Sequence, residues 1–75
     1  MAQVRRVTAI IEREEGGYAA LCPEYDIASQ GATIEEARAN LVEALGLFFE
    51  CEVAAEVERR FHPEVLITQV DVRVA

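Results

Sequence analysis

The sequence predicts an α+β fold in which three strands precede a long helix and a further strand comes last. Three observations lead to this prediction. Apolar residues alternate with polar ones near both ends of the chain, glycines interrupt the first half at short intervals, and one central stretch carries apolar residues at spacings of three and four. Seventy-five residues make one small domain, so residues 1–75 are expected to fold as a single unit.

The first two predicted strands form a hairpin. Residues 4–14 alternate, with Val7, Ala9 and Ile11 on one face. A compact turn at residues 15–17 follows, because glycine adopts positive φ at little cost. The chain then returns as a second strand through "YAALC".

A third strand is expected next to the second. Pro23 ends the second strand, because proline cannot donate a ladder hydrogen bond, and Asp26 suits the turn that follows. Residues 27–30 then form a short strand that stops at Gly31. The three strands are predicted to make an antiparallel meander.

The long helix is signalled at both ends. Thr33 is the expected N-cap, and Glu36, three residues later, completes a capping box. The helix is expected to end near Cys51, because Glu52 would otherwise place a carboxylate on the apolar stripe. That stripe faces the sheet and consists of Ile34, Ala37, Leu41, Leu45 and Phe48.

A short helix and a last strand complete the predicted order β-β-β-α-(short α)-β. Residues 54–61 have helical character, which His62 and Pro63 interrupt, and residues 66–74 alternate like a strand with one buried face. After a helical crossover this strand is expected to run parallel to the first, with right-handed connectivity. The predicted sheet order is 3-2-1-4.

Composition restricts the partners and the compartment. Fourteen acidic and seven basic side chains make a net charge of −7, which repels nucleic acid and favours a basic protein partner. The N-terminal apolar run of five residues is too short for a signal peptide or a membrane span. With two cysteines and no secretion signal, a cytoplasmic location follows. An apolar content of 52% in so small a domain suggests a homo-oligomer.

No catalytic, metal or cofactor site is expected. The strand order matches the front half of a ribonuclease H fold, whose enzymes hold two metal ions on carboxylates, yet "VTAII" in the first strand contains none. Cys22, Cys51 and His62 match no zinc spacing, and Gly16-Gly17 is a turn without the pattern of a phosphate loop. The protein is therefore predicted not to be an enzyme.

Two surfaces are candidates for binding. Glu24, Tyr25 and Asp26 lie in the loop between the second and third strands, where they are predicted to contact a partner. For Tyr25 a packing role is equally compatible with the sequence, whereas Tyr18 is expected to pack the hairpin. Leu47 and Phe49 point away from the apolar stripe and are predicted to contribute to self-association.

The stretch "EEGGYAALCPEYDIASQGATIEEARANLVEAL" resembles the N-terminal domain of the HicB family of antitoxins. The resemblance implies a partial ribonuclease H-like fold without nuclease activity. It also implies binding to, and masking of, a small basic HicA-type toxin that cleaves RNA. The matching residues are mostly structural ones, and they are Gly17, Tyr18, Pro23, Glu24, Gly31, Thr33, Glu36, Ala37, Asn40, Glu43 and Ala44.

The C-terminal part looks like that of a short subgroup of this family. Full-length members carry a DNA-binding segment after the domain, whereas this sequence stops at Ala75 with nothing basic left to read DNA. Direct nucleic-acid binding is accordingly not expected. The alternative hypothesis is a solitary oligomeric binding module without a toxin partner.

Overall fold

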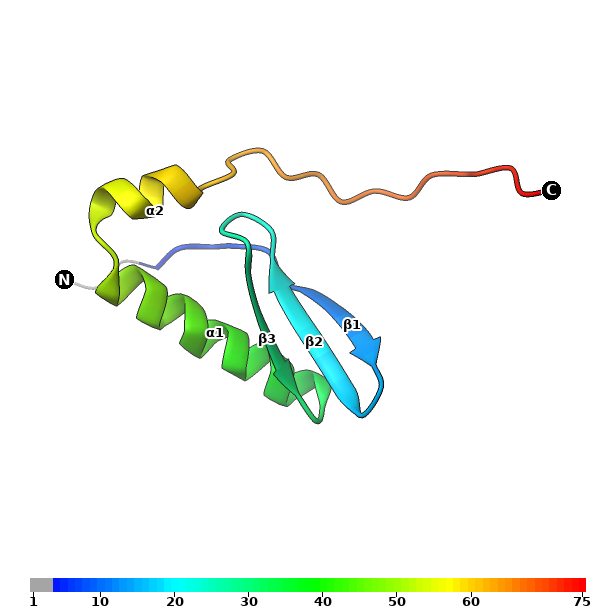
Figure 1. Ribbon diagram of the computed structural model, residues 1–75, viewed down its shortest axis with the longest axis horizontal. Helices are drawn as coiled ribbons and strands as arrows, with labels where there is room; N and C mark the ends of the chain where they lie inside the picture. Colours follow the sequence, from blue (N-terminus) through cyan, green and yellow to red (C-terminus); the bar gives the residue numbers. More distant parts are fainter. Residues whose placement is uncertain (1–3) are drawn as a thin grey trace.

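The computed structural model describes residues 4–75 and has the predicted α+β class (Figure 1). Its antiparallel sheet has the order β1-β2-β3, and two helices follow the sheet in the chain. The elements are β1 (Ile10–Glu14), β2 (Gly17–Cys22), β3 (Ile27–Gly31), α1 (Ile34–Cys51) and α2 (Ala54–Arg60). The meander and both helices are thus confirmed.

The sheet presents one face to α1. Ile11 pairs with Ala20, and Ala20 pairs with Ser29, so these three side chains share a face because pairing partners point the same way. The first strand is shorter than predicted: residues 4–9 are extended but are not assigned to a strand. The hairpin turn has a φ of 83° at Gly16, a left-handed conformation that glycine adopts without steric cost.

The capping box forms at the start of α1. The Thr33 hydroxyl accepts a hydrogen bond from the Glu36 backbone N–H at 3.1 Å. The Glu36 carboxylate reaches back to the N–H of Ala32, also at 3.1 Å, one residue further than in the usual box. Farther along the helix, Asn40 Nδ2 donates to the carbonyl of Gln30 at 2.8 Å and ties α1 to β3.

The core lies between α1 and the sheet, mainly against β2 and β3. Ile34, which the sequence places on the apolar stripe, is 45% exposed, because the first turn of α1 lies at the end of the sheet. Phe48 is half-buried against the core. The buried side chains are Ala20, Cys22, Tyr25, Ala37, Leu41 and Leu45.

The expected fourth strand is not part of this sheet. Residues 61–75 carry no strand pairing, and the chain runs away from the sheet after α2 (Figure 1). The backbone N–H of His62 donates to the carbonyl of Glu24 at 2.7 Å, which holds the start of this segment at the β2–β3 loop. Beyond that anchor the segment makes no backbone hydrogen bond to the sheet, so the prediction of a parallel strand from the same chain is not met.

Candidate partner-binding surfaces

Tyr25, predicted as a possible contact for a partner, is a core residue. Its side chain is only 2% exposed. Its ring lies 4.9 Å from that of Phe49, 5.7 Å from Phe48 and 5.3 Å from Phe61, measured between centroids. The ring of Tyr25 therefore packs in the core of this chain, as the packing alternative expected, and does not stand exposed on the surface. The sequence alone left this open because Phe61 reaches the loop only after α1 and α2 have folded back.

Glu24 connects the β2–β3 loop to the N-terminal segment. Its carboxylate accepts hydrogen bonds from the Thr8 backbone N–H at 2.9 Å and from the Thr8 hydroxyl at 2.8 Å. Burial acts to raise the pKa of Glu24, but the two hydrogen bonds from Thr8 favour the charged form, and the pKa lies below its ordinary value. Most of the acceptor capacity of Glu24 is thus used inside the fold.

The lowered pKa of Glu24 predicts a pH dependence of stability. A folded-state pKa below the unfolded value means that the contribution is fully present above about pH 4.5 and is lost as the pH falls through the folded value. We expect Glu24→Gln to destabilise the protein at pH 7 by about 1 kcal/mol or less, since the carboxylate is only partly buried and water weakens the contribution of its charge.

The difference in unfolding free energy between wild type and Glu24→Gln should shrink between pH 5 and pH 3, as measured by urea unfolding at each pH. Glu50→Gln, at an exposed position on α1, is the control and should not change this pH profile. A constant difference across the range would show that the Glu24 contact does not depend on charge.

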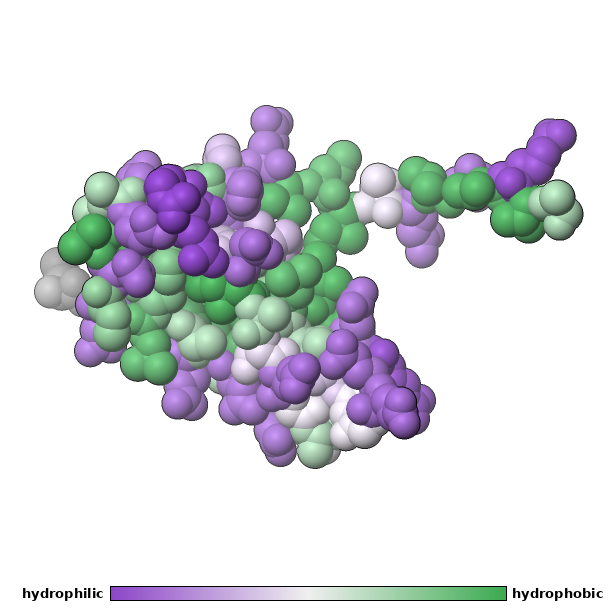
Figure 2. Space-filling view, in the orientation of Figure 1, coloured by the Kyte–Doolittle hydropathy of each residue, from purple (hydrophilic) through white to green (hydrophobic). Residues whose placement is uncertain are grey.

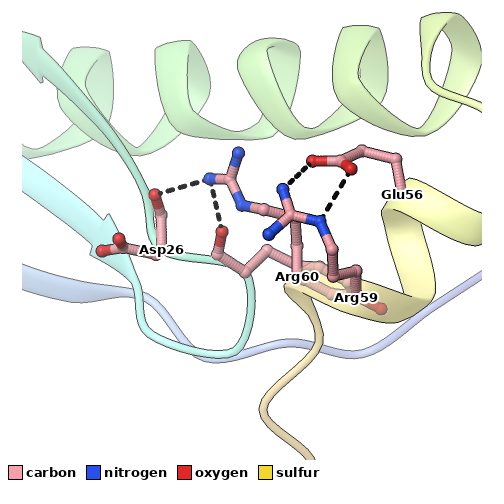
Figure 3. A network of polar contacts seen from close by, with 5 residues as sticks. Asp26, Glu56, Arg59 and Arg60 are labelled. Atoms are coloured by element: carbon pink, nitrogen blue, oxygen red, sulfur yellow. Dashed lines mark hydrogen bonds and ion pairs between the residues drawn. The ribbon is translucent and has the colours of Figure 1, made fainter.

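Asp26 stays exposed, but arginines surround its loop. Its φ is 55°, a left-handed conformation that Asp tolerates better than most residues. Arg60 Nη2 donates to the carbonyls of Tyr25 at 2.8 Å and Asp26 at 3.1 Å (Figure 3). Arg59 pairs with Glu56 nearby, its Nε lying 2.9 Å from the carboxylate (Figure 3). The loop region is therefore not a concentrated acidic surface.

Five exposed carboxylates, with Arg13 among them, lie toward the opposite end of the sheet. The tight β1–β2 turn lies there beside the junction of β3 and α1, and hydrophilic residues cover this end in the space-filling view (Figure 2). We call this region the acidic end; its exposed carboxylates belong to Glu12, Glu14, Glu15, Glu35 and Glu36. It was not singled out from the sequence, because the two groups of glutamates are about twenty residues apart and only the meander brings them together.

An apolar groove lies between the N-terminal segment and the second half of α1. Its volume is about 620 Å³, and it is lined by Val4, Arg5, Val7, Val42, Leu45, Gly46 and Phe49. The Arg5 guanidinium lies 5.1 Å from the centre of the Phe49 ring, within the range of a cation–π interaction. Phe49 is thus placed both in the aromatic cluster and in this groove.

Leu47 does not share a surface with Phe49. It is 54% exposed and lines a different shallow hollow together with Ser29, Asn40, Glu43 and Ala44. The two residues predicted for self-association therefore cannot form one continuous patch by themselves. The groove at Phe49 is the larger apolar feature.

Neither a metal centre nor a membrane span is found in the described part of the chain. Within residues 4–75, no three or more His, Cys, Asp and Glu side chains are grouped so as to hold an ion. Burial raises the pKa of the Cys22 thiol, so this cysteine is in its neutral form, whereas Cys51 is exposed. Neither helix in these residues is long and apolar enough to cross a bilayer.

Comparison with known proteins places the chain among small relatives of similar length. No family model and no solved structure matches it. UPF0150 protein ssl0738 of Synechocystis sp. is 48% identical over 65 residues, which cover 84% of this chain and 88% of the relative. UPF0150 protein ssr1765 of the same organism is 43% identical over 54 residues, covering 69% and 68%. With such identity over most of both sequences, the chain belongs to the UPF0150 family.

Proposed function

We propose that this protein is a HicB-like antitoxin that binds a small basic RNA-cleaving toxin in the cytoplasm and masks its RNA-contacting face. The observation that carries the proposal is the acidic excess, a net charge of −7, on a β-β-β-α scaffold whose acidic end exposes five carboxylates. A toxin that binds RNA needs a positive face, and an acidic protein is attracted to that face and can cover it.

The scaffold supports the resemblance on which the proposal rests. Gly17 and Gly31 stand where the backbones of neighbouring elements approach closely, and Thr33 and Glu36 cap α1. These signature residues stabilise the fold, so we expect other residues, on the surface, to bind the toxin. We also propose that β1, β2, β3 and α1 together correspond to part of a ribonuclease H-like fold. The part of β1 and its preceding segment that would need a metal-binding carboxylate is apolar, which favours binding over cleavage.

The acidic end is the favoured surface for the toxin. At the β2–β3 loop, which the sequence first suggested, Glu24 is bonded to Thr8, Tyr25 is buried, and Arg60 lies against Asp26. A basic partner gains little attraction there. At the acidic end the carboxylates of Glu14 and Glu15 are exposed and make no ion pair among the described residues.

The test is recovery of a nuclease and its inhibition. Tagged protein is used to isolate partners from a lysate of its own organism, and the recovered protein is assayed for RNA cleavage with and without added antitoxin. We expect a small basic protein whose cleavage the added protein suppresses. Glu14→Arg with Glu15→Arg should weaken the complex at least tenfold.

Asp26→Asn is the matched control and should bind as wild type does, since Asn tolerates the same left-handed conformation. Two results contradict the proposal: no nuclease is recovered, or the charge reversal at the acidic end leaves binding unchanged. The second candidate function is a solitary oligomeric binding module, and the uncovered C-terminal segment favours it. Either of these two results would make this module the better description of the protein.

A further inference from the structure

Residues 64–74 form a strand-like segment without a partner, which we call the C-terminal arm. It is extended, and its alternation places Leu66, Val70, Val72 and Val74 on one face. These four side chains are 72–85% exposed, and the molecule measures 53 Å in its longest dimension because the arm projects from it (Figure 1). An exposed apolar strand of this length pairs readily with a free sheet edge.

Of the two outer strands of the sheet, β1 and β3, the first follows a segment that lines an apolar groove. β1 is the first strand in the order β1-β2-β3, so one side of it has no neighbour. Residues 4–9 lead into β1 without a strand assignment of their own, and their backbone trace is stretched out (Figure 1). Val7 lines the groove, and Ile11 packs against the core, so a strand added here would place every second side chain over apolar surface.

The two segments match best when they run antiparallel. Setting Leu66 opposite Ile11 also sets Val70 opposite Val7 on the inner face. The same register sets Ile67 opposite Ile10 on the outer face. It further brings Glu64 opposite Arg13 and Asp71 opposite Arg6, two pairs of opposite charge. A parallel alignment that covers the same inner face sets Leu66 beside Val7 and Val70 beside Ile11. It then places Asp71 beside Glu12, which is a pair of like charges.

The arm cannot reach this antiparallel register on its own sheet. His62 is bonded to the carbonyl of Glu24, whose carboxylate is bonded to Thr8, so the arm starts level with Thr8. Glu64 would have to lie beside Arg13, about 17 Å farther along the strand. The two residues from His62 to Glu64 span at most about 7 Å.

A parallel strand from the same chain is also poorly matched. Starting level with Thr8, it would pass the end of β1 at Glu14 after about six residues. Val70, Val72 and Val74 would then extend beyond the sheet without a neighbour. The hydrogen bond from His62 to Glu24 thus excludes the antiparallel register within one chain. In the parallel register it leaves about half of the arm without a neighbouring strand.

We infer that the arm pairs with a second copy of this chain. Two copies exchange their arms, and each arm adds an antiparallel strand beside residues 6–13 of the other copy, with Leu66 and Val70 directed over its groove. The exchange is symmetric, so the β1 edge of each copy is covered in a closed dimer.

Crosslinking between differently tagged chains tests this arrangement. In a Cys51→Ser background, one chain carries Ala9→Cys and the other Thr68→Cys, which the register places opposite each other. After co-expression and treatment with a short bismaleimide, we expect the mixed crosslinked dimer to approach the limit of about half of the chains that random pairing allows. Val74→Cys replaces Thr68→Cys in the control pair, which should crosslink at least fivefold less.

A second measurement separates the arm from the fold. Val70→Asp should raise the dissociation constant of the dimer at least tenfold, because it places a carboxylate over the groove. Gln69→Asp, on the other face of the arm, should change it less than threefold. Val70 is 77% exposed in the single chain, so circular dichroism should show both variants folded. A monomeric mass by light scattering at all concentrations, or no mixed crosslink, overturns the inference.

Discussion

Gly31→Ala is expected to destabilise the fold strongly. A Cβ built at Gly31 lies 2.4 Å from the backbone nitrogen of Ala37 and 2.7 Å from the carbonyl carbon of Glu36. Both neighbours are backbone atoms of α1, so the helix has to move away from β3 to make room. Overpacking typically costs about 1–3 kcal/mol, and a clash with backbone atoms, which cannot rotate away, places this substitution at the upper end of that range. For a small domain that is a large part of the free energy of unfolding.

Urea unfolding followed by circular dichroism measures this effect, and Gly46→Ala provides the comparison. At Gly46, in the middle of α1, an added Cβ meets no atom within 4 Å. Alanine there should raise the unfolding free energy by about 0.5–1 kcal/mol, because it lowers the entropy of the unfolded chain and favours helix. Equal midpoints for Gly31→Ala and wild type would show that β3 and α1 are not in the close contact described.

Leu41→Ala is expected to destabilise the fold by about 2–5 kcal/mol. Leu41 is 2% exposed and lies in the same buried cluster as Ala20 and Cys22, so truncation leaves a cavity between α1 and β2. Val42→Ala, at the next position and 59% exposed, should change the unfolding free energy by less than about 0.5 kcal/mol. Similar losses for the two variants in thermal and urea unfolding would contradict the placement of the core.

The binding surfaces were predictable only in part. The loop at Glu24 was predicted to contact a partner, and in the structure the Glu24 carboxylate also accepts hydrogen bonds from Thr8 of the N-terminal segment. That contact joins residues sixteen apart in the chain, so no local pattern signals it. The acidic end was missed for the same reason, because its glutamates come from a turn and from a helix start that only the meander brings together.

What the sequence by itself determined is the set of local structures. The hairpin turn at Gly16, the capping box at Thr33 and Glu36, and the helix end at Cys51 depend on conformational preferences and hydrogen bonds within a few residues. Tertiary structure decided which side chains these elements cover. Tyr25 became a core residue because Phe48, Phe49 and Phe61 converge on it. The C-terminal arm has every local feature of a strand, but a strand needs a neighbour, and the anchor at His62 decides which edge the arm can reach.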